Sequence, residues 1–593
     1  ALGWYEGRQV YRSHSHYNDA DYAKFGTFSK SEKNESGPEP GDMGSPSVPL
    51  DSWIYPAMER LSAWGYIESA DLGLRPWARM ECARLLAEEA KARIDEQSEG
   101  DGEPAKIYAE LMQEFSDENS RLEGNSNLGI DLDTVYTRFT GISGRALQDG
   151  LHFGQTIIND FGRPYASGFN NVTGFTSHAV AGPFFYEAQV EYQHAPGYAA
   201  ISQDARNFIQ SADGLPSAPP GTPIGAVNKI DLLEGYVGVQ LANWQLTFGK
   251  QALWWGEDES GPMLFSTNAA PILMLQINRV KPFFLPSIFK GIGPIRASYF
   301  LGRTSGYHWV FSSNTGFAGS WTKPLSDQPF IVGEKLSFKP TSNLEVGFAV
   351  TALAGGTGVP FTAHKLVQAS ISIGNGNPGT SQDAGDHRGA FDIAYRMPKL
   401  RDWLTFYADA FTDDQSNPWV AWNKSAVTSG FYMPKLPKIS KLDFRAEGIF
   451  TDLPWGTPVV HIPGFFYFND RFKSGYTNDG NLIGSWIGRE GQGVAAWTNY
   501  WFTPRNKLQF NFRHQKVSRQ FIPEGGTLTD LGVRSDFWMR TNFGVSAWIQ
   551  YERWLFPVVE PGAVRNTTAA LEFVFAPQKL LRHAATNASG NQP

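Results

Sequence analysis

Cysteine is almost absent from the sequence, and this limits the chemistry that the chain can perform. Cys82 is the only cysteine among 593 residues. An intrachain disulfide is therefore excluded, and a cysteine-based zinc site is not expected. The other potential metal ligands are scattered along the chain, so we predict neither a metal site nor a cofactor.

An excess of positive charge and long apolar runs are also missing. The formal net charge is −8, whereas proteins that bind nucleic acid usually present a basic face, so we expect no nucleic-acid partner. A run of about 18 apolar residues does not occur, which excludes a transmembrane helix. The chain begins at Ala1 without a methionine. We expect a mature chain that has lost a signal peptide, although a shortened chain would look the same.

The motifs of common enzyme classes are absent as well. The sequence contains no G-x-S-x-G elbow, no H-E-x-x-H motif and no P-loop. The consecutive acids Glu257, Asp258 and Glu259 could imitate a catalytic carboxylate pair. Acids in loops are more often simply solvated, however, and we predict that the protein is not an enzyme.

The residues that are present divide the chain into regions of different character. Residues 1–47 are polar and poor in aliphatic side chains, which predicts a flexible segment. Between 48 and 124, apolar residues recur at steps of three and four, which predicts a small helical module. We interpret residues 125–150 as a connector, 151–580 as the main folded unit and 581–593 as a flexible tail.

Within the main unit, apolar and polar residues alternate. Tyr186–Gln193 places Glu and Gln on one face and Tyr, Ala and Val on the other, and Leu508–Gln515 and Leu442–Gly448 follow the same pattern. Such alternation is typical of antiparallel strands with one apolar face. We find about nineteen candidate strands of roughly ten residues, the length that crosses a membrane at a tilt.

The connections between these candidates alternate between short and long. Ala242–Asn243, Pro340–Asn343 and Arg540–Phe543 are short, whereas 195–230 and 452–492 are long. Outer-membrane barrels have short periplasmic turns and long outside loops, and a soluble sandwich has no reason to separate its loops in this way. The sequence therefore predicts a mainly β fold, a transmembrane antiparallel β-barrel in the outer membrane of a Gram-negative bacterium, with the helical module on the periplasmic side.

The number of strands requires one candidate to be rejected, because bacterial single-chain barrels use even numbers. We leave out the first, Thr134–Gly144, and predict about 18 strands beginning near Leu151. We also expect long loops such as Thr304–Gln328 and Asp452–Gln492 to fold inward and occlude the lumen. They carry more apolar surface than water tolerates.

Tryptophans in the long loops are the main candidates for function. The stretch LWWGEDESGP, from Leu253, places two indole rings beside three acids at the start of one loop. Indoles stack on the C–H faces of pyranose rings while carboxylates bind hydroxyl groups, so this combination suits a sugar. The alternative is an aromatic girdle or packing at the barrel rim. The candidate carbohydrate-binding residues are Trp254, Trp255, Glu257, Asp258, Trp309, Trp321, Trp455 and Trp486.

The order of these features resembles that of the Wzi-type capsule assembly proteins. The likeness is carried by the helical module before the barrel, by LWWGEDESGPMLFSTNAAP and by NDGNLIGSWIGREGQG, and it covers most of residues 48–580. It implies an outer-membrane lectin that holds capsular or extracellular polysaccharide at the cell surface, with a barrel plugged by helices and loops. A porin or transporter barrel, anchored to the cell wall by the helical module, remains the alternative. Either protein would contact outer-membrane lipid.

The helical module is also similar to a surface-layer homology repeat. VPLDSWIYPAMERLSAWGYI parallels the entry helix of that family, and ARME stands where the repeat usually has Thr-Arg-x-Glu. This resemblance implies that a cell-wall polymer binds Trp53, Arg79 and Glu81, although Ala78 replaces the threonine. The alternative is a compact three-helix plug with Trp53 in its core.

Overall fold

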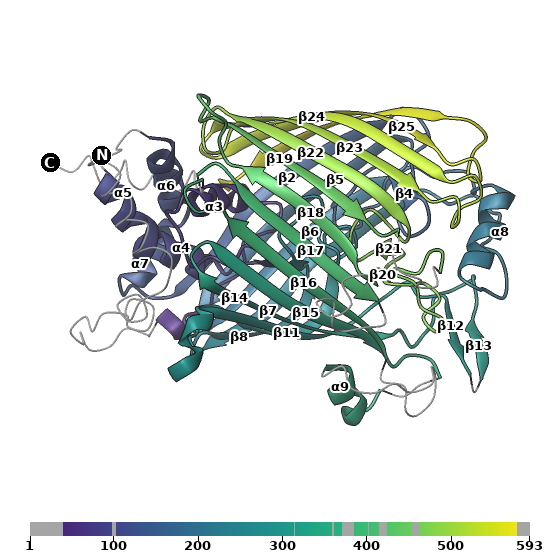
Figure 1. The fold of residues 1–593 in the computed structure, drawn as a ribbon, viewed down its shortest axis with the longest axis horizontal. Coiled ribbons are helices and arrows are strands. Elements are labelled where there is room, and N and C mark those ends of the chain that lie inside the picture. Colours follow the sequence, from purple (N-terminus) through teal and green to yellow (C-terminus); the bar gives the residue numbers. More distant parts are fainter. Residues whose placement is uncertain are drawn as a thin grey trace.

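The computed structural model shows one large barrel with helices at one end (Figure 1). It describes residues 40–97, 102–313, 315–358, 361–370, 385–400, 402–413, 424–452 and 462–577. The barrel is closed and antiparallel and has 18 strands, so the predicted fold class and strand number are confirmed. Among the helices of the described ranges, none is long and apolar enough to cross a membrane.

The strands follow one another around the barrel in chain order. β2 pairs with both β5 and β26, which closes the wall. The wall strands are β2 (Leu128–Ile142), β5 (Gly168–Ala181), β6 (Phe184–Ala195), β7 (Val227–Leu241), β8 (Trp244–Gln251), β10 (Ile272–Arg279), β11 (Ile295–Arg303), β14 (Phe330–Thr341), β15 (Leu344–Ala354), β16 (Asp386–Arg396), β17 (Thr405–Asp413), β18 (Ala426–Met433), β19 (Leu442–Phe450), β22 (Gly491–Trp501), β23 (Lys507–Val517), β24 (Gly526–Arg540), β25 (Phe543–Leu555) and β26 (Val564–Phe575).

β2 corrects the predicted start of the barrel. The rejected candidate Thr134–Gly144 lies largely within this strand, and the supposed connector 125–150 supplies part of the wall. The barrel therefore begins at Leu128 and not near Leu151. Closure explains the difference, because without β2 the strands β5 and β26 would each present an unpaired edge to lipid. Leu151 is instead buried in an apolar cluster inside the barrel.

The wall strands alternate between lipid-facing and lumen-facing side chains. In β10, Leu273, Leu275 and Ile277 are exposed on the outside, whereas Met274 and Gln276 between them are buried. Large exposed aliphatic side chains in this pattern are unfavourable in water and are typical of a barrel surrounded by lipid.

The two ends of the barrel differ in the length of their connections. Turns at 182–183, 242–243, 342–343 and 541–542 join strands at one end, whereas segments such as 196–226, 304–329 and 451–490 join them at the other. We call these the short-turn end and the long-loop end. In outer-membrane barrels short turns face the periplasm, so the long-loop end faces outward.

The connections carry short elements of their own. At the long-loop end, α8 and the pair β12–β13 project beyond the wall (Figure 1). The short elements in the connections at both ends are β3 (Gln148–Asp149), β4 (Gly154–Gln155), α8 (Gln203–Ala212), β9 (Trp254–Trp255), the 3-10 helix η3 (Ser287–Ile292), β12 (Trp309–Ser312), β13 (Gly316–Gly319), α9 (Ala363–Ser370), β20 (Thr477–Asn478) and β21 (Asn481–Leu482).

The helical module lies at the short-turn end (Figure 1). Its core contains Trp77 and Tyr55, whose ring centroids are 5.1 Å apart. Trp53 is only partly buried at the edge of this core, so the expectation that it forms the centre is wrong. The module comprises η1 (Pro40–Asp42), α3 (Ile54–Ala63), β1 (Leu74–Arg75), α4 (Arg79–Leu85), the π-helix η2 (Leu86–Ala90), α5 (Lys91–Gln97), α6 (Glu103–Glu114) and α7 (Ser116–Leu122).

The module and a long loop meet inside the barrel. β1 of the module pairs with β9, which belongs to the loop between β8 and β10. Around this contact lies a cluster of buried side chains that we call the luminal core. It includes Trp255, Met263, Phe265, Phe300, Tyr307, Tyr467, Tyr476 and Trp486. The lumen is therefore filled at this level by loop and module residues. Of the two loops predicted to fold inward, 452–492 does so with Tyr467, Tyr476 and Trp486, whereas 304–328 contributes Tyr307 but carries the hairpin β12–β13, which projects beyond the wall (Figure 1).

Candidate functional site

Trp254 and Trp255 lie inside the barrel and not on its outer surface. The side chain of Trp255 is 1% exposed and that of Trp254 is 8% exposed. The Trp255 ring meets the edges of Phe265 and Phe300 at centroid distances of 5.1 and 5.5 Å. The prediction that these indoles form an outward platform for sugar is therefore wrong.

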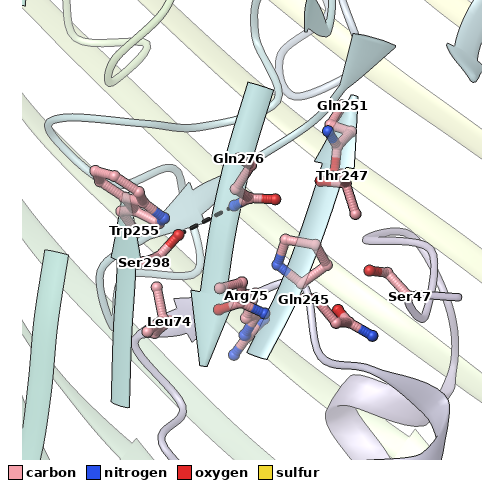
Figure 2. Close-up of a pocket in the computed structure, with 11 residues that line it drawn as sticks. Ser47, Leu74, Arg75, Gln245, Thr247, Gln251, Trp255, Gln276 and Ser298 are labelled. Carbon is pink, nitrogen blue, oxygen red and sulfur yellow. Dashed lines mark hydrogen bonds between the residues drawn. The ribbon is translucent and has the colours of Figure 1, made fainter. Parts of the chain in front are cut away.

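The space beside Trp255 is too small for a sugar. Figure 2 shows the residues around it, which come from the module and from three neighbouring wall strands. They enclose about 10 Å³, which is about the size of one water molecule. On the wall, the amide of Gln276 donates to the hydroxyl of Ser298 at 3.0 Å. This region is a packed seam between module and barrel.

Glu257 and Asp258 are also buried, at 7% and 1% exposure, so the expectation of solvated loop acids is wrong. The loop that carries them is held by acids of the wall. The carboxylate of Glu447 accepts the backbone N–H groups of Glu259 at 2.8 Å and Ser260 at 3.2 Å. Asp409 accepts the N–H of Met263 at 2.9 Å in the same loop. Carboxylates of the lumen wall thus accept backbone N–H groups of this loop in place of water.

Trp486 lies in the same luminal core. It is 1% exposed, and the guanidinium of Arg513 lies 5.1 Å from its ring centroid. The preceding hairpin β20–β21 turns through Asp479 and Gly480, both with positive φ, as its Asn-Asp-Gly sequence indicates. Trp486 therefore packs the lumen and is not accessible to a polymer. Trp455 lies outside the described residues.

Trp309 and Trp321 are the predicted tryptophans that the structure brings together near the surface. They flank the hairpin β12–β13 at the long-loop end (Figure 1). Their ring centroids are 6.4 Å apart, and the ring of His308 lies 5.7 Å from that of Trp321. All three rings are partly exposed. We call Trp309, Trp321 and His308 the surface ring cluster.

The surface ring cluster is fixed from behind. The indole N–H of Trp321 donates to the carbonyl of Ser217 at 3.0 Å, which ties the hairpin to the loop that carries α8. An apolar cluster that includes Phe153, Ile209 and Phe556 supports both tryptophans. Rings that are held on one side and partly open on the other suit stacking against a flat ligand. No sequence motif indicates that His308 belongs to this cluster, and its position next to Trp309 is the only signal for it.

A buried histidine joins the surrounding loops. His152 contacts the carboxylates of Asp149 at 2.8 Å and Asp213 at 3.0 Å, and Asp213 also pairs with Arg489 at 2.5 Å. Burial disfavours the charged imidazolium, but the two carboxylates outweigh it and raise the pKa of His152 to about 10. We call these four residues the loop clasp. At neutral pH a protonated His152 and Arg489 both bind Asp213, so the clasp links three separate long loops.

A larger cavity of about 660 Å³ lies between the module and the wall. Its lining includes Trp53 of the module and Arg534 and Trp548 of the wall. It also includes Arg505 and Trp538 near the short-turn end, so the cavity reaches the periplasmic side of the barrel.

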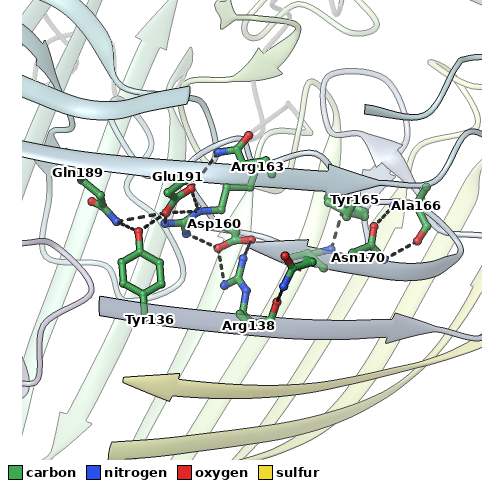
Figure 3. A network of polar contacts seen from close by, with 12 residues as sticks. Tyr136, Arg138, Asp160, Arg163, Tyr165, Ala166, Asn170, Gln189 and Glu191 are labelled. Carbon is green, nitrogen blue, oxygen red and sulfur yellow. Dashed lines mark hydrogen bonds and ion pairs between the residues drawn. The ribbon is translucent and has the colours of Figure 1, made fainter. Parts of the chain in front are cut away.

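Two of the cations along this cavity, Arg138 and Arg163, are already paired with acids. Figure 3 shows Arg138 bound to Asp160, and Arg163 joining Asp160 to Glu191. The two Arg138–Asp160 contacts measure 2.9 and 2.6 Å. Tyr136 donates to Glu191 at 2.5 Å. This network fastens the loop after β2 to the wall and leaves these arginines engaged.

The candidate cell-wall residues serve the module itself or its contact with the barrel. Arg79 pairs with Glu118 at 2.7 Å, and Glu81 is buried and pairs with Arg84 at 2.6 Å. The guanidinium of Arg505, in a short turn, lies 4.2 Å from the ring centroid of Trp53. These contacts favour the alternative interpretation of the module as a plug.

Comparisons with known proteins assign the barrel to a family. The family model described as capsule assembly protein Wzi matches residues 138–569. A similar solved structure is Wzi of Escherichia coli, an outer membrane protein involved in group 1 capsule assembly and described as a carbohydrate-binding β-barrel. It has a TM-score of 0.60 and 16% identity over 90% of this chain and 99% of that chain. A search of curated proteins gives no match.

Other solved structures give weaker matches. OprD of Pseudomonas aeruginosa has a TM-score of 0.37 and 8% identity over 75% of this chain and 95% of that chain. OccAB2 of Acinetobacter baumannii has a TM-score of 0.38 and 9% identity over 75% and 98%. Similarities this weak do not indicate a function. The family match covers most of the chain, including nearly the whole wall, and the protein therefore belongs to the Wzi capsule assembly family of outer-membrane β-barrels.

Proposed function

We propose that the protein binds capsular or extracellular polysaccharide at the cell surface and helps to assemble or retain it there, without catalysis. Membership of the Wzi family carries this proposal. The Escherichia coli relative is described as a carbohydrate-binding barrel. The surface ring cluster at the outward-facing end supplies a chemically suitable binding surface.

Trp321 is the residue on which we expect a sugar ring to stack. Its indole lies beside His308 and Trp309, and the hydroxyls of Ser320 and Thr322 lie next to it in the chain. Pyranose C–H groups would cover the ring while hydroxyls exchange hydrogen bonds with these neighbours. One such contact is weak, so retention of a polymer would depend on several units or several barrels binding at once.

The filled lumen argues against the alternative of an open diffusion porin. The pairing of β1 with β9 joins the module to a loop that comes from the other end. We infer that the module is a periplasmic plug and that outer-membrane lipid surrounds the wall. Planar-bilayer recordings of the purified protein should show little steady conductance, and conductance at the level of an open porin would contradict this.

A retention assay with purified capsular polysaccharide tests the function. We expect Trp321→Ala to weaken retention by roughly threefold to tenfold, because stacking of this kind contributes about 0.5–1.5 kcal/mol per ring. Heat-resistant folding of the barrel should not change. Phe317→Ala is a matched control, since Phe317 is an exposed ring of the same hairpin that packs on Phe311. Unchanged retention after substitution of both Trp309 and Trp321 by alanine would contradict the assignment of the site.

A further inference from the structure

Cations gather on one strip of the outer wall near the long-loop end. Strand register places His514 opposite Thr529, Thr529 opposite Arg553, and Arg553 opposite Arg565. We call these four residues the cationic row. Lys516, which is exposed, lies one outward-facing position nearer the long loops on β23.

The cationic row faces outward at the upper edge of the lipid-facing surface. Arg553 alternates along β25 with Glu552 and Trp554, which are fully buried in the lumen. One outward-facing position closer to the membrane centre, Phe512, Leu531 and Tyr551 are opposite one another and exposed. An apolar band that ends in aromatic side chains marks the membrane interface of such barrels. The row therefore lies at the depth of the outer-leaflet headgroups.

The two arginines of the row are in an unfavourable position when nothing is bound. Arg553 and Arg565 are directly opposite on adjacent strands, where facing β-carbons lie about 4.5–5.5 Å apart and like charges destabilise the pair. Both side chains are exposed. Over the described part of the chain, neither forms an ion pair with a carboxylate.

Three other cations near the long-loop end have acidic partners. Lys229 and Lys250 share Asp231 at 2.9 and 3.3 Å. Arg303 pairs with Asp327 at 3.2 Å. In contrast to these three cations, Arg553 and Arg565 leave room for an external anion.

We propose that the cationic row binds the phosphate groups of a glycolipid in the outer leaflet. Two guanidinium groups side by side provide the planar, forked donors that phosphate oxygens accept. His514, which contacts the hydroxyl of Thr529 at 2.8 Å, adds a polar edge on the same row. The exposed Leu531 and Tyr551 directly below would contact the acyl chains of the same molecule. A lipid-borne phosphate fits both features, whereas a free phosphate would use only the first.

A binding measurement on the purified full-length barrel in detergent tests this inference. The probes are diphosphoryl lipid A, the same lipid after removal of its phosphates, and inorganic phosphate. Each basic side chain near an anionic lipid surface contributes roughly a fivefold gain in binding, so R553Q/R565Q should bind diphosphoryl lipid A about thirtyfold more weakly than the unsubstituted barrel. The matched control R303Q, which removes a paired cation at the same end, should bind it normally.

The remaining probes separate phosphate recognition from acyl-chain contact and from binding of a free anion. The dephosphorylated lipid should bind both proteins equally weakly, and inorganic phosphate should bind far more weakly than the lipid. In lipid-free detergent the double variant should be at least as heat-resistant as the unsubstituted barrel, because a repulsive pair has been removed. If it failed to fold, R553Q and R565Q singly would carry the same comparison.

Several results would overturn the inference. Equal binding of diphosphoryl lipid A by R553Q/R565Q and the unsubstituted barrel would do so. Inorganic phosphate binding as tightly as the lipid would indicate a free-anion site. Loss of polysaccharide retention with unchanged lipid binding would assign the row to the polymer. Because polysaccharide retention is measured separately, failure of this inference leaves the proposed function intact.

Discussion

Two long loops that leave the same end of the barrel take opposite paths. The loop at 252–271 descends into the lumen, where Trp255 is buried beside the helical module. The loop at 304–329 carries the hairpin β12–β13, which projects beyond the wall with Trp309 and Trp321 partly exposed (Figure 1). Each contains two tryptophans, so aromatic content does not separate them.

The two loops differ in how their backbone polar groups are satisfied. The first loop depends on the rest of the barrel, since β9 pairs with β1 and the acids Glu447 and Asp409 accept its N–H groups. The second forms its own two-stranded sheet through the pairing of Trp309–Ser312 with Gly316–Gly319. The first loop has an internal bridge between Trp255 and Phe265, but its other polar backbone groups must find partners elsewhere, and the polar lumen supplies them. A paired hairpin can remain outside and present its rings.

Trp255→Ala should have the largest effect among these predictions, and it tests whether the first loop is part of the luminal core. Removal of a fully buried aromatic ring leaves a cavity and typically costs about 3–5 kcal/mol of stability. We therefore expect a clear loss of heat-resistant folding, with polysaccharide retention falling only in proportion to the folded protein. Trp244→Ala is the control, because this ring is exposed on the outer wall at 40%. A loss of retention with unchanged thermal stability would contradict the buried role of Trp255.

Glu447→Ala should have a smaller effect on the same loop. This carboxylate accepts the N–H groups of Glu259 and Ser260 and the hydroxyl of Tyr407, the last at 2.7 Å. Its removal would leave buried donors without an acceptor, at about 1–3 kcal/mol. The loop should become more sensitive to proteolysis, and conductance in planar bilayers should rise from a low baseline. Glu560→Gln, a change of a partly exposed acid in the loop between β25 and β26, should change neither measurement.

The wall could be predicted from the sequence because membrane and lumen impose a strict alternation on every strand. Tyr186–Gln193 and Leu508–Gln515 lie in β6 and β23 with the predicted faces. The error at Thr134–Gly144 came from the rule of even strand number, which showed that one candidate had to be rejected but not which one. Only the pairing of β2 with both β5 and β26 identifies it as a wall strand.

The site residues were harder to predict, because the path of a loop depends on partners that are distant in the sequence. The acids after Trp255 indicate solvent when they are considered alone. Glu257 and Asp258 are buried nevertheless, because Glu447 and Asp409, almost 200 and 150 residues later, hold their loop. Trp309 and Trp321 are partly exposed at the long-loop end, although their loop is one that the sequence predicts to fold inward. No sequence pattern indicates that Ser217 of another loop fixes the orientation of Trp321. Arg553 and Arg565 become neighbours only through strand register.

The smallest effect that we expect concerns the loops at the long-loop end and comes from breaking the loop clasp. His152 has a pKa of about 10 in the folded protein, compared with its usual value of 6.5. A group whose pKa is raised by folding stabilises the fold fully at pH values below its pKa in the unfolded chain. This contribution is lost as the pH rises through its pKa in the folded protein. The clasp should therefore be strongest below about pH 6.5 and should weaken towards pH 10.

Proteolysis of the long-loop end at a series of pH values measures this loss. In the unsubstituted protein, cleavage at the loops that the clasp joins should accelerate between about pH 7 and 10, because deprotonation of His152 removes its charge between Asp149 and Asp213. His152→Gln should be cleaved faster already at pH 6 and should lack most of this pH dependence.

His194→Gln is the control, since His194 contacts Asn228 at the outer rim and its change should leave the profile unaltered. An identical pH profile in His152→Gln and the unsubstituted protein would show that the clasp does not hold these loops.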